Sequence, residues 1–360
     1  MQIRIHQRWP EISPIALAIV LTFLTTTANS VFKDFGLAAL LMVAVVTSVH
    51  HAELIAHRLG EPFGTLILAL AVTVIETALI LAVMWSASPS DALLARDTMY
   101  STVMIACNGV VGICLLLGGI RHKEQFFRIE GTGPGFAALA TMCVLVLVLP
   151  IYTTSSPEGT YTNSQLVFVA LSSLSLWLVF VFIQTIRHRD YFLPAESVSD
   201  ESVHALPPSK VKAYFSYFFL FISLISVVVA AKLLSPSIYS WIETANAPKA
   251  VAGIVIAAIV LLPETWAAIR AAKADRLQTS MNLAIGSAMA SIGLTIPIVV
   301  AVCVAFELPI TLGLDPKDVI LLMLTFLIGS MTLGSGRTNV MQGAIHLVLF
   351  ASFLFLTLVP

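Results

Sequence analysis

Two glutamates stand alone inside long apolar stretches of this sequence. Glu76 lies within residues 63–86, and Glu264 lies within residues 248–270. An isolated carboxylate near the middle of a bilayer helix costs about 2.5–3.5 kcal/mol on insertion scales. A sequence that accepts this cost twice, in similar settings, predicts that both groups are used. We therefore expect Glu76 and Glu264 to form one ion site.

Small and polar residues are dense around both glutamates. For most of these positions the alternative role is packing, because small side chains let helix backbones approach closely. As ligands, the hydroxyl and amide oxygens, with backbone carbonyls near Pro263, would complete the oxygen shell that a hard cation such as Ca²⁺ requires. Four of them are candidate cation or proton ligands: Thr73, Asn108, Ser287 and Ser291.

The two carboxyl groups also suit proton binding. Burial and a neighbouring carboxylate both favour the protonated form of a carboxyl group. An entering cation favours the ionised form and displaces the protons. Competition of this kind, at a site exposed alternately to the two sides, is proton/cation exchange. The alternative is a pair of permanently protonated acids that hydrogen-bond to neighbouring helices.

A histidine-rich segment over residues 48–58 allows a different chemistry. His50, His51 and Glu53 suggest the centre of an intramembrane metal-dependent enzyme, but the pattern is not H-E-x-x-H, which places two histidines on one helix face. The segment is also typical of a helix end at the membrane interface. A third role, for Glu53 and His50, is regulation or a route for protons. A cation channel is a further alternative, and it would need a continuous polar lining.

Composition identifies the class of protein. The chain has 360 residues, of which 58% are hydrophobic and 11% charged, against roughly 25% charged in soluble domains. We expect an all-α polytopic membrane protein with about eleven spans. The four cysteines fall in apolar runs, where small buried hydrophobes are expected. The predicted spans are 13–32, 35–56, 63–86, 98–120, 134–152, 164–186, 213–234, 248–270, 280–305, 317–334 and 339–359.

The order of the spans predicts two inverted repeats. Residues 1–34 hold an extra helix, 35–186 the first repeat, 187–212 a polar cytoplasmic linker and 213–360 the second repeat. Each glutamate lies on the second span of its repeat, and such transporters bind substrate where their repeats meet. Of the 19 Lys and Arg residues, 14 fall on the side of the N-terminus. This places the N-terminus in the cytoplasm and the C-terminus outside.

Asp97 stands at the mouth of the predicted fourth span, on the outer side. It could attract cations from outside. The alternative is a charge at a helix start, where it complements the helix dipole.

Several motifs resemble one family. Residues 51–70 (H-A-E-L-I-A-H-R-L-G-E-P-F-G-T-L-I-L-A-L), the L-P-E ending at Glu264 followed by N-L-A-I-G-S, and residues 335–350 (S-G-R-T-N-V-M-Q-G-A-I-H-L-V-L-F) resemble bacterial ChaA-type calcium/proton antiporters of the calcium/cation antiporter superfamily. Residues 118–127 (G-G-I-R-H-K-E-Q-F-F) are similar to the segment that ends the fourth span in calcium/proton exchangers. The resemblance covers nearly the whole chain, in order.

The resemblance implies ten core helices in two inverted five-helix repeats, plus an extra first helix. It implies a central site that exchanges Ca²⁺, Na⁺ or K⁺ for H⁺ in a bacterial inner membrane, with no cofactor and no nucleic-acid partner. The acidic positions of the family motifs fall on Glu76 and Glu264, and a Gly-Ser pair falls on Gly286 and Ser287. The Gly-Asn pair that precedes each acid in typical relatives is absent here, so the site has fewer amide oxygens than a dedicated Ca²⁺ site.

Overall fold

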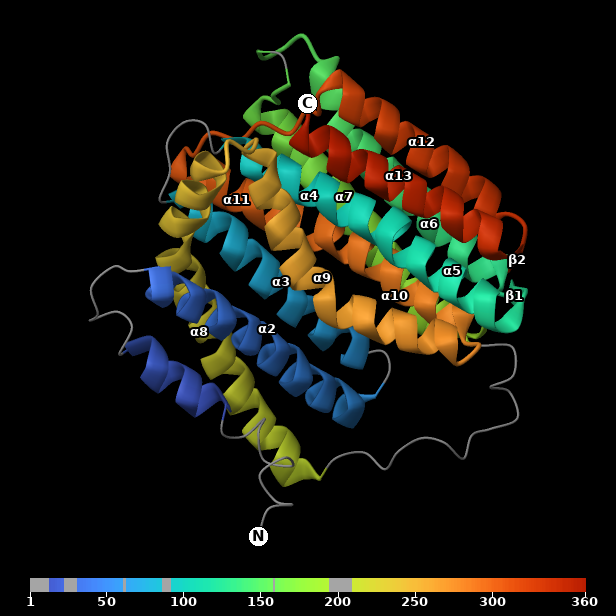
Figure 1. The fold of residues 1–360 in the computed structure, drawn as a ribbon, viewed down its shortest axis with the longest axis horizontal. Helices are drawn as coiled ribbons and strands as arrows, with labels where there is room; N and C mark the ends of the chain where they lie inside the picture. Colours follow the sequence, from blue (N-terminus) through green and yellow to red (C-terminus); the bar gives the residue numbers. More distant parts are fainter. Residues whose placement is uncertain (1–12, 23–30, 61–62, 86–91, 158, 194–208) are drawn as a thin grey trace. The chain divides into compact units, whose positions relative to one another are not determined.

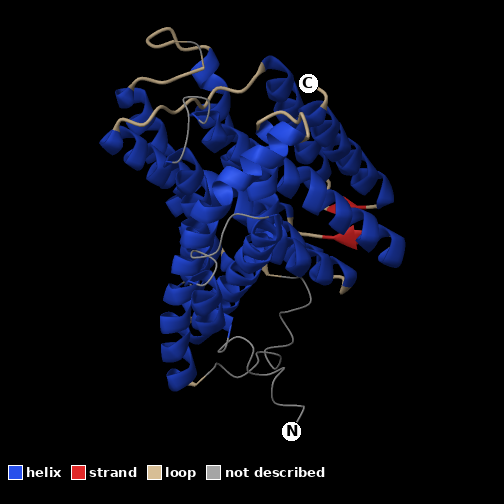
Figure 2. Ribbon diagram, turned by 60° about the vertical axis from the view of Figure 1, so that its left-hand side comes forward, coloured by secondary structure: helices blue, strands red, loops and turns tan. Residues whose placement is uncertain are grey.

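The computed structural model describes residues 13–22, 31–60, 63–85, 92–157, 159–193 and 209–360. Most of these residues are helical, and two short strands complete the regular structure of the described part (Figure 2). Ten of the described helices are long and apolar enough to cross a membrane, and Ser13–Thr22 is a shorter apolar helix. The prediction of an all-α polytopic membrane protein is confirmed. The rest of the predicted first span, residues 23–30, lies outside the described residues.

The chain divides into two compact units, which are described separately. Unit 1 comprises Met1–Asp91 and His204–Asn246. Within it α2 packs along α8, and both contact α3. Its long helices are α2 (Val31–Leu59), α3 (Phe63–Trp85) and α8 (Lys210–Thr244).

The predicted span 213–234 was too short. Helix α8 starts at Lys210, where the Ser209 hydroxyl accepts a hydrogen bond from the Lys212 backbone N–H, and it ends at Thr244. Pro236 lies inside this helix. Membrane helices tolerate an internal proline when neighbouring groups satisfy the backbone.

Unit 2 comprises Ala92–Val203 and Ala247–Pro360. Several of its spans change helix type part-way, so that one span comprises two or three consecutive elements. In Figure 1, for example, α4 and α5 label successive parts of one long helix. Its elements are α4 (Leu94–Met104), η3 (Ile105–Val110), α5 (Val111–His122), β1 (Gln125–Phe126), α6 (Ile129–Cys143), η4 (Val144–Val148), η5 (Leu149–Ile151), α7 (Asn163–Phe182), η6 (Ile183–Arg187), η7 (Arg189–Phe192), α9 (Ala250–Lys273), α10 (Leu277–Ala290), η10 (Ser291–Thr295), α11 (Ile296–Phe306), α12 (Pro316–Leu333), β2 (Arg337–Thr338) and α13 (Val340–Leu358).

A π-helical segment interrupts each span that follows a glutamate-bearing helix. η3 joins α4 to α5, and η10 joins α10 to α11. Every residue of both segments is buried. Single π-helical turns inside α-helices are rare and are frequent at functional sites, and η3 and η10 are the two that lie on the spans following the glutamate-bearing helices.

The two strands connect distant parts of unit 2. β1 pairs with β2 in antiparallel register, with Gln125 opposite Thr338 and Phe126 opposite Arg337. Asn339 then caps α13, because its side chain accepts a hydrogen bond from the Met341 backbone N–H. The R-T-N motif is thus a strand followed by a helix cap, beside the packed pair α5 and α13.

The cysteine prediction is confirmed: Cys107, Cys114, Cys143 and Cys303 are free and buried. In the predicted linker, η7 is described and residues 194–208 lie outside the described residues. The Phe192 carbonyl accepts a hydrogen bond of 2.6 Å from the Asn282 amide of α10. The start of the linker is therefore fixed to unit 2.

Candidate functional site

Glu76 lies on α3 of unit 1, and its exposed fraction is 0%. One turn before it, the buried Thr73 hydroxyl donates a 2.8 Å hydrogen bond to the Ala69 carbonyl. Directly after it, the buried Thr77 hydroxyl has no hydrogen-bond partner among the described residues. The apolar helix thus holds one carboxyl group flanked by two hydroxyl groups.

Glu264 lies on α9 of unit 2 and is half-buried. Pro263 precedes it inside the helix. Proline has no N–H, so the Ile259 carbonyl loses its usual helical donor beside the carboxyl group. The Thr265 hydroxyl donates to the Leu261 carbonyl at 2.7 Å.

The span that packs against α9 carries the two predicted serines. The Ser287 hydroxyl on α10 is buried and has no hydrogen-bond partner in the described part of the chain. Ser291 is buried and begins η10. Helix α10 is held to α9 by the Ser280 hydroxyl, which donates to the Ala268 carbonyl at 2.7 Å.

Asn108 is the centre of a buried polar network in η3. Its amide nitrogen donates to the Thr325 hydroxyl of α12 at 2.8 Å, and its amide oxygen lies 3.1 Å from Nδ1 of His346 on α13. Nε2 of His346 lies 3.1 Å from the Thr332 hydroxyl. All four side chains are at least 97% buried. The network fixes the orientation of the Asn108 amide.

Unit 2 therefore brings Asn108, Glu264 and Ser287 onto mutually packed segments, since α9 contacts α10 and η3, and η3 contacts α10. Ser291 begins η10, which directly follows α10. Thr73 and Glu76 belong to unit 1. That Glu76 and Glu264 share one site stays a prediction.

The histidine-rich segment lies on α2 of unit 1. His51 is buried with its ring 5.3 Å from that of Phe219, whereas Glu53 is exposed and His50 is half-buried. Among the described residues no three His, Cys, Asp or Glu side chains are grouped to hold a metal ion. The metal-enzyme alternative therefore has no centre in this part of the chain.

Two features escaped the sequence analysis. A threonine follows each glutamate, as Glu76-Thr77 and Glu264-Thr265, and this repeated pair was a readable signal. Asp97, predicted either to attract cations or to be a charge at a helix start, is buried in an ion pair whose Arg96 Nε to Asp97 Oδ1 distance is 2.8 Å. No local pattern shows that Arg96 also reaches Gly313, 217 residues away.

Known proteins resemble this chain over most of its length. The sodium/calcium exchanger protein family matches residues 34–186 and 215–359. A putative ionic transporter, y4hA, of Sinorhizobium fredii is 45% identical over 90% of this chain and 88% of its own. The sodium-potassium/proton antiporter ChaA of Escherichia coli is 33% identical over 97% of this chain and 96% of its own.

The fold matches a solved structure of the H⁺/Ca²⁺ exchanger CAX, with a TM-score of 0.72 at 16% identity, over 96% of this chain and 88% of that one. These relatives are ion transporters by name, so the prediction of a transporter rather than an enzyme is confirmed. The motifs, the helical membrane fold and the match across both halves agree: this chain belongs to the sodium/calcium exchanger protein family.

Proposed function

We propose that this chain is a cation/proton antiporter in which Glu76 and Glu264 bind both the cation and the protons. The observation that carries the proposal is the pair of carboxyl groups held in apolar spans, one fully buried and one half-buried. Removing a carboxylate from water is costly unless it is protonated or faces a cation. In the transport cycle each carboxyl group is therefore either protonated or bound to the cation.

The exchange balances in charge. Two neutral carboxyl groups release two protons when one Ca²⁺ binds both carboxylates, and each Na⁺ or K⁺ replaces one proton. Thr73, Ser287 and Ser291 add hydroxyl oxygens, and Asn108 adds an amide oxygen. The name of the Escherichia coli relative supports proton coupling, and it supports Na⁺ and K⁺ as transported cations that are alternatives to Ca²⁺.

Glu76 and Glu264 act in one site between inverted repeats and are exposed alternately to the two sides. The protein lies in a bacterial inner membrane with its N-terminus in the cytoplasm. Glu53 and His50 serve regulation or a proton route, and the cycle needs no cofactor beyond the transported ions.

The test is proton movement in proteoliposomes with an acidified lumen and a dye that reports ΔpH. Ca²⁺, Na⁺ and K⁺ are added separately to the parent and to Glu76→Gln and Glu264→Gln. We expect one or more cations to release protons from the parent, and both variants to be silent. Glu130→Gln makes the same change at an exposed position of α6 and should exchange like the parent.

Two results would contradict the proposal. Exchange by both glutamine variants at the parent's rate would make the carboxyl groups structural. A parent that conducts cations without moving protons would favour a channel.

A further inference from the structure

A cavity of about 120 Å³ lies in unit 2, away from the residues around Glu264. It is placed where α4, α9 and α12 begin and α13 ends. On α9 its lining stops at Ala250, fourteen residues before Glu264, which is about 21 Å along a helix that rises 1.5 Å per residue. Three side-chain carboxyl groups line it: Asp97, Asp315 and Asp318. The predicted orientation puts this end of the unit outside.

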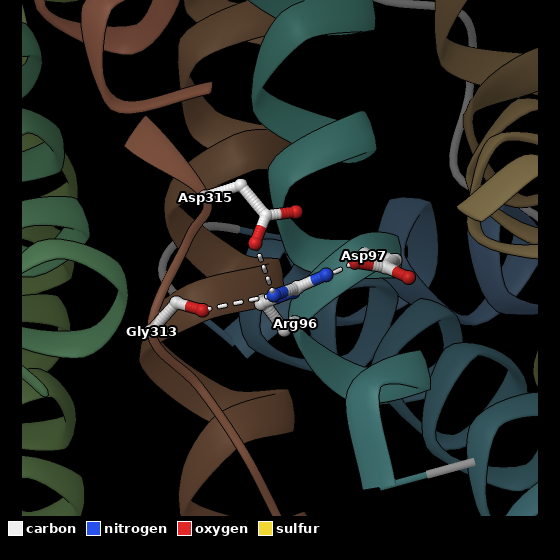
Figure 3. Close-up of polar contacts among 4 residues, drawn as sticks. All are labelled: Arg96, Asp97, Gly313 and Asp315. Carbon is white, nitrogen blue, oxygen red and sulfur yellow. Dashed lines mark hydrogen bonds and ion pairs between the residues drawn. The ribbon is translucent and has the colours of Figure 1, made fainter. Parts of the chain in front are cut away.

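One of the three carboxyl groups, that of Asp97, is already in a close ion pair. Arg96 donates through Nε to Asp97 at 2.8 Å and through Nη1 to the Gly313 carbonyl at 3.0 Å (Figure 3). Both side chains of this pair are about nine-tenths buried. Arg96 reaches Asp315 only at 3.7 Å, and the Asp315 side chain is 59% exposed. The Arg96–Asp97 ion pair is therefore a buried part of the cavity lining, whereas Asp315 is only weakly paired with Arg96.

The other two carboxyl groups are compensated less closely than Asp97 is. Asp315 is the residue before α12, yet its side chain makes no capping hydrogen bond. The described residues place no cationic nitrogen within 4.0 Å of the half-buried Asp318. The neighbouring Lys317 ammonium instead donates to the Leu356 carbonyl at 2.7 Å. A partly buried carboxylate whose counter-charges are this distant is less favourable than a closely paired one, so a cation would stabilise this arrangement.

A buried hydroxyl points to the same conclusion. Tyr100 lines the cavity, is 4% exposed and stands edge-on to the Phe353 ring at 5.3 Å. Its hydroxyl makes no hydrogen bond of ordinary geometry with the described part of the chain, and the nearby carboxyl group that could accept a weak one is Asp318. Buried polar groups normally have well-formed hydrogen bonds, and an ion or a water held between this hydroxyl and Asp318 would satisfy both groups.

We propose that this cavity binds a hard metal cation, still partly hydrated, through Asp315, Asp318 and the Tyr100 hydroxyl. Oxygen ligands of this kind suit Ca²⁺ and similar cations, and the cavity has room for waters beside the ion. Arg96, Lys317 and the helix N-terminus at α12 oppose the bound charge. The site is therefore weak, as an entrance site must be if the ion is to move on.

Binding is tested directly with Tb³⁺, a hard cation whose luminescence nearby tyrosine sensitises. The full chain carries Glu76→Gln and Glu264→Gln, so that signal from the proposed transport site is absent. We expect a saturable signal that Ca²⁺ displaces. Asp315→Asn and Asp318→Asn should each weaken Tb³⁺ binding about tenfold, which corresponds to ~1.4 kcal/mol. Tyr100→Phe should lower the sensitised emission.

Two control variants distinguish the loss of a carboxylate in the cavity from the loss of a carboxylate elsewhere and from misfolding. Glu307→Gln removes a carboxylate from the exposed loop before α12 and should bind Tb³⁺ like its parent. Asp318→Glu keeps the carboxylate and should keep saturable binding, so a loss in Asp318→Asn alone is not misfolding. The proposal is overturned if both asparagine variants bind like their parent, or if Glu307→Gln loses as much.

The entrance role rests on the proposed antiport, whereas the binding does not. In the otherwise native chain, Asp318→Asn should raise KM for the exchanged cation and leave kcat unchanged. An unchanged KM would overturn the entrance role. A parent that exchanges no cation would refute the antiport and leave the Tb³⁺ result to decide on the cavity.

Discussion

At the scale of single residues, Asn108 is both a predicted ligand and a structural junction, that is, a side chain that links η3 to α12 and α13. Its amide nitrogen and oxygen are hydrogen-bonded to Thr325 and His346, which lie 217 and 238 residues away in the sequence. An amide oxygen has two lone pairs, so one acceptor direction is left for a cation. The ligand role of Asn108 stays a prediction, and its junction role can be measured separately.

Thr325→Val removes the hydroxyl that accepts from Asn108 and keeps the side-chain shape. It leaves a buried amide N–H unsatisfied, which costs about 1–3 kcal/mol. We expect a lower apparent Tm in detergent, measured by differential scanning fluorimetry. Thr141→Val is the matched control, because the exposed Thr141 hydroxyl bonds only within its own helix, to Ala137. Equal Tm values for the two variants would contradict the junction role.

At the scale of elements, the approach of α9 to α4 depends on one glycine. A Cβ on Gly253 would lie 2.6 Å from the Asp97 carbonyl carbon and 2.8 Å from the Thr98 nitrogen. These are backbone atoms, so they move only if a whole helix moves. The crossing also positions Asp97 and Ala250 on the walls of the cavity.

Gly253→Ala should therefore lower stability by about 1–3 kcal/mol, the usual cost of overpacking, and should weaken Tb³⁺ binding in the cavity. Gly133→Ala is the control, because the only described atom near its added Cβ is an Ile129 methyl at 3.8 Å. Alanine there is expected to be neutral or to stabilise by roughly 0.5–1 kcal/mol through helix propensity. A Gly253→Ala protein as stable as the control would mean that the helices separate without cost.

At the scale of the whole molecule, the orientation of the spans stays a prediction from Lys and Arg counts. It places the loop after α5 inside and the loop before α7 outside. The native cysteines are buried, so single exposed cysteines can report on each side.

Ser155→Cys and Glu124→Cys introduce thiols at two exposed loop positions. In right-side-out vesicles a membrane-impermeant maleimide should label Ser155→Cys at once and Glu124→Cys only after permeabilisation. The opposite order would reverse the predicted orientation. Labelling of both cysteines from the same side would contradict the prediction that α6, η4 and η5 cross the membrane between them.

The sequence by itself determined the fold class, most span boundaries and the two intramembrane glutamates. The length of an apolar run and the presence of a charge within it are local properties, so they can be recognised from the sequence alone. The predicted span 213–234 ends two residues before Pro236, whereas α8 continues through this proline to Thr244, because membrane helices tolerate an internal proline.

Only the tertiary structure decided the π-helical segments, the Asn108 network and the cavity. The bond from Arg96 to Gly313 and the bond from Asn108 to Thr325 each join residues 217 positions apart. Such partners are chosen by how helices pack, and no periodicity or motif encodes them locally. The same long-range packing leaves Asp318 and Tyr100 facing a space that a cation can fill.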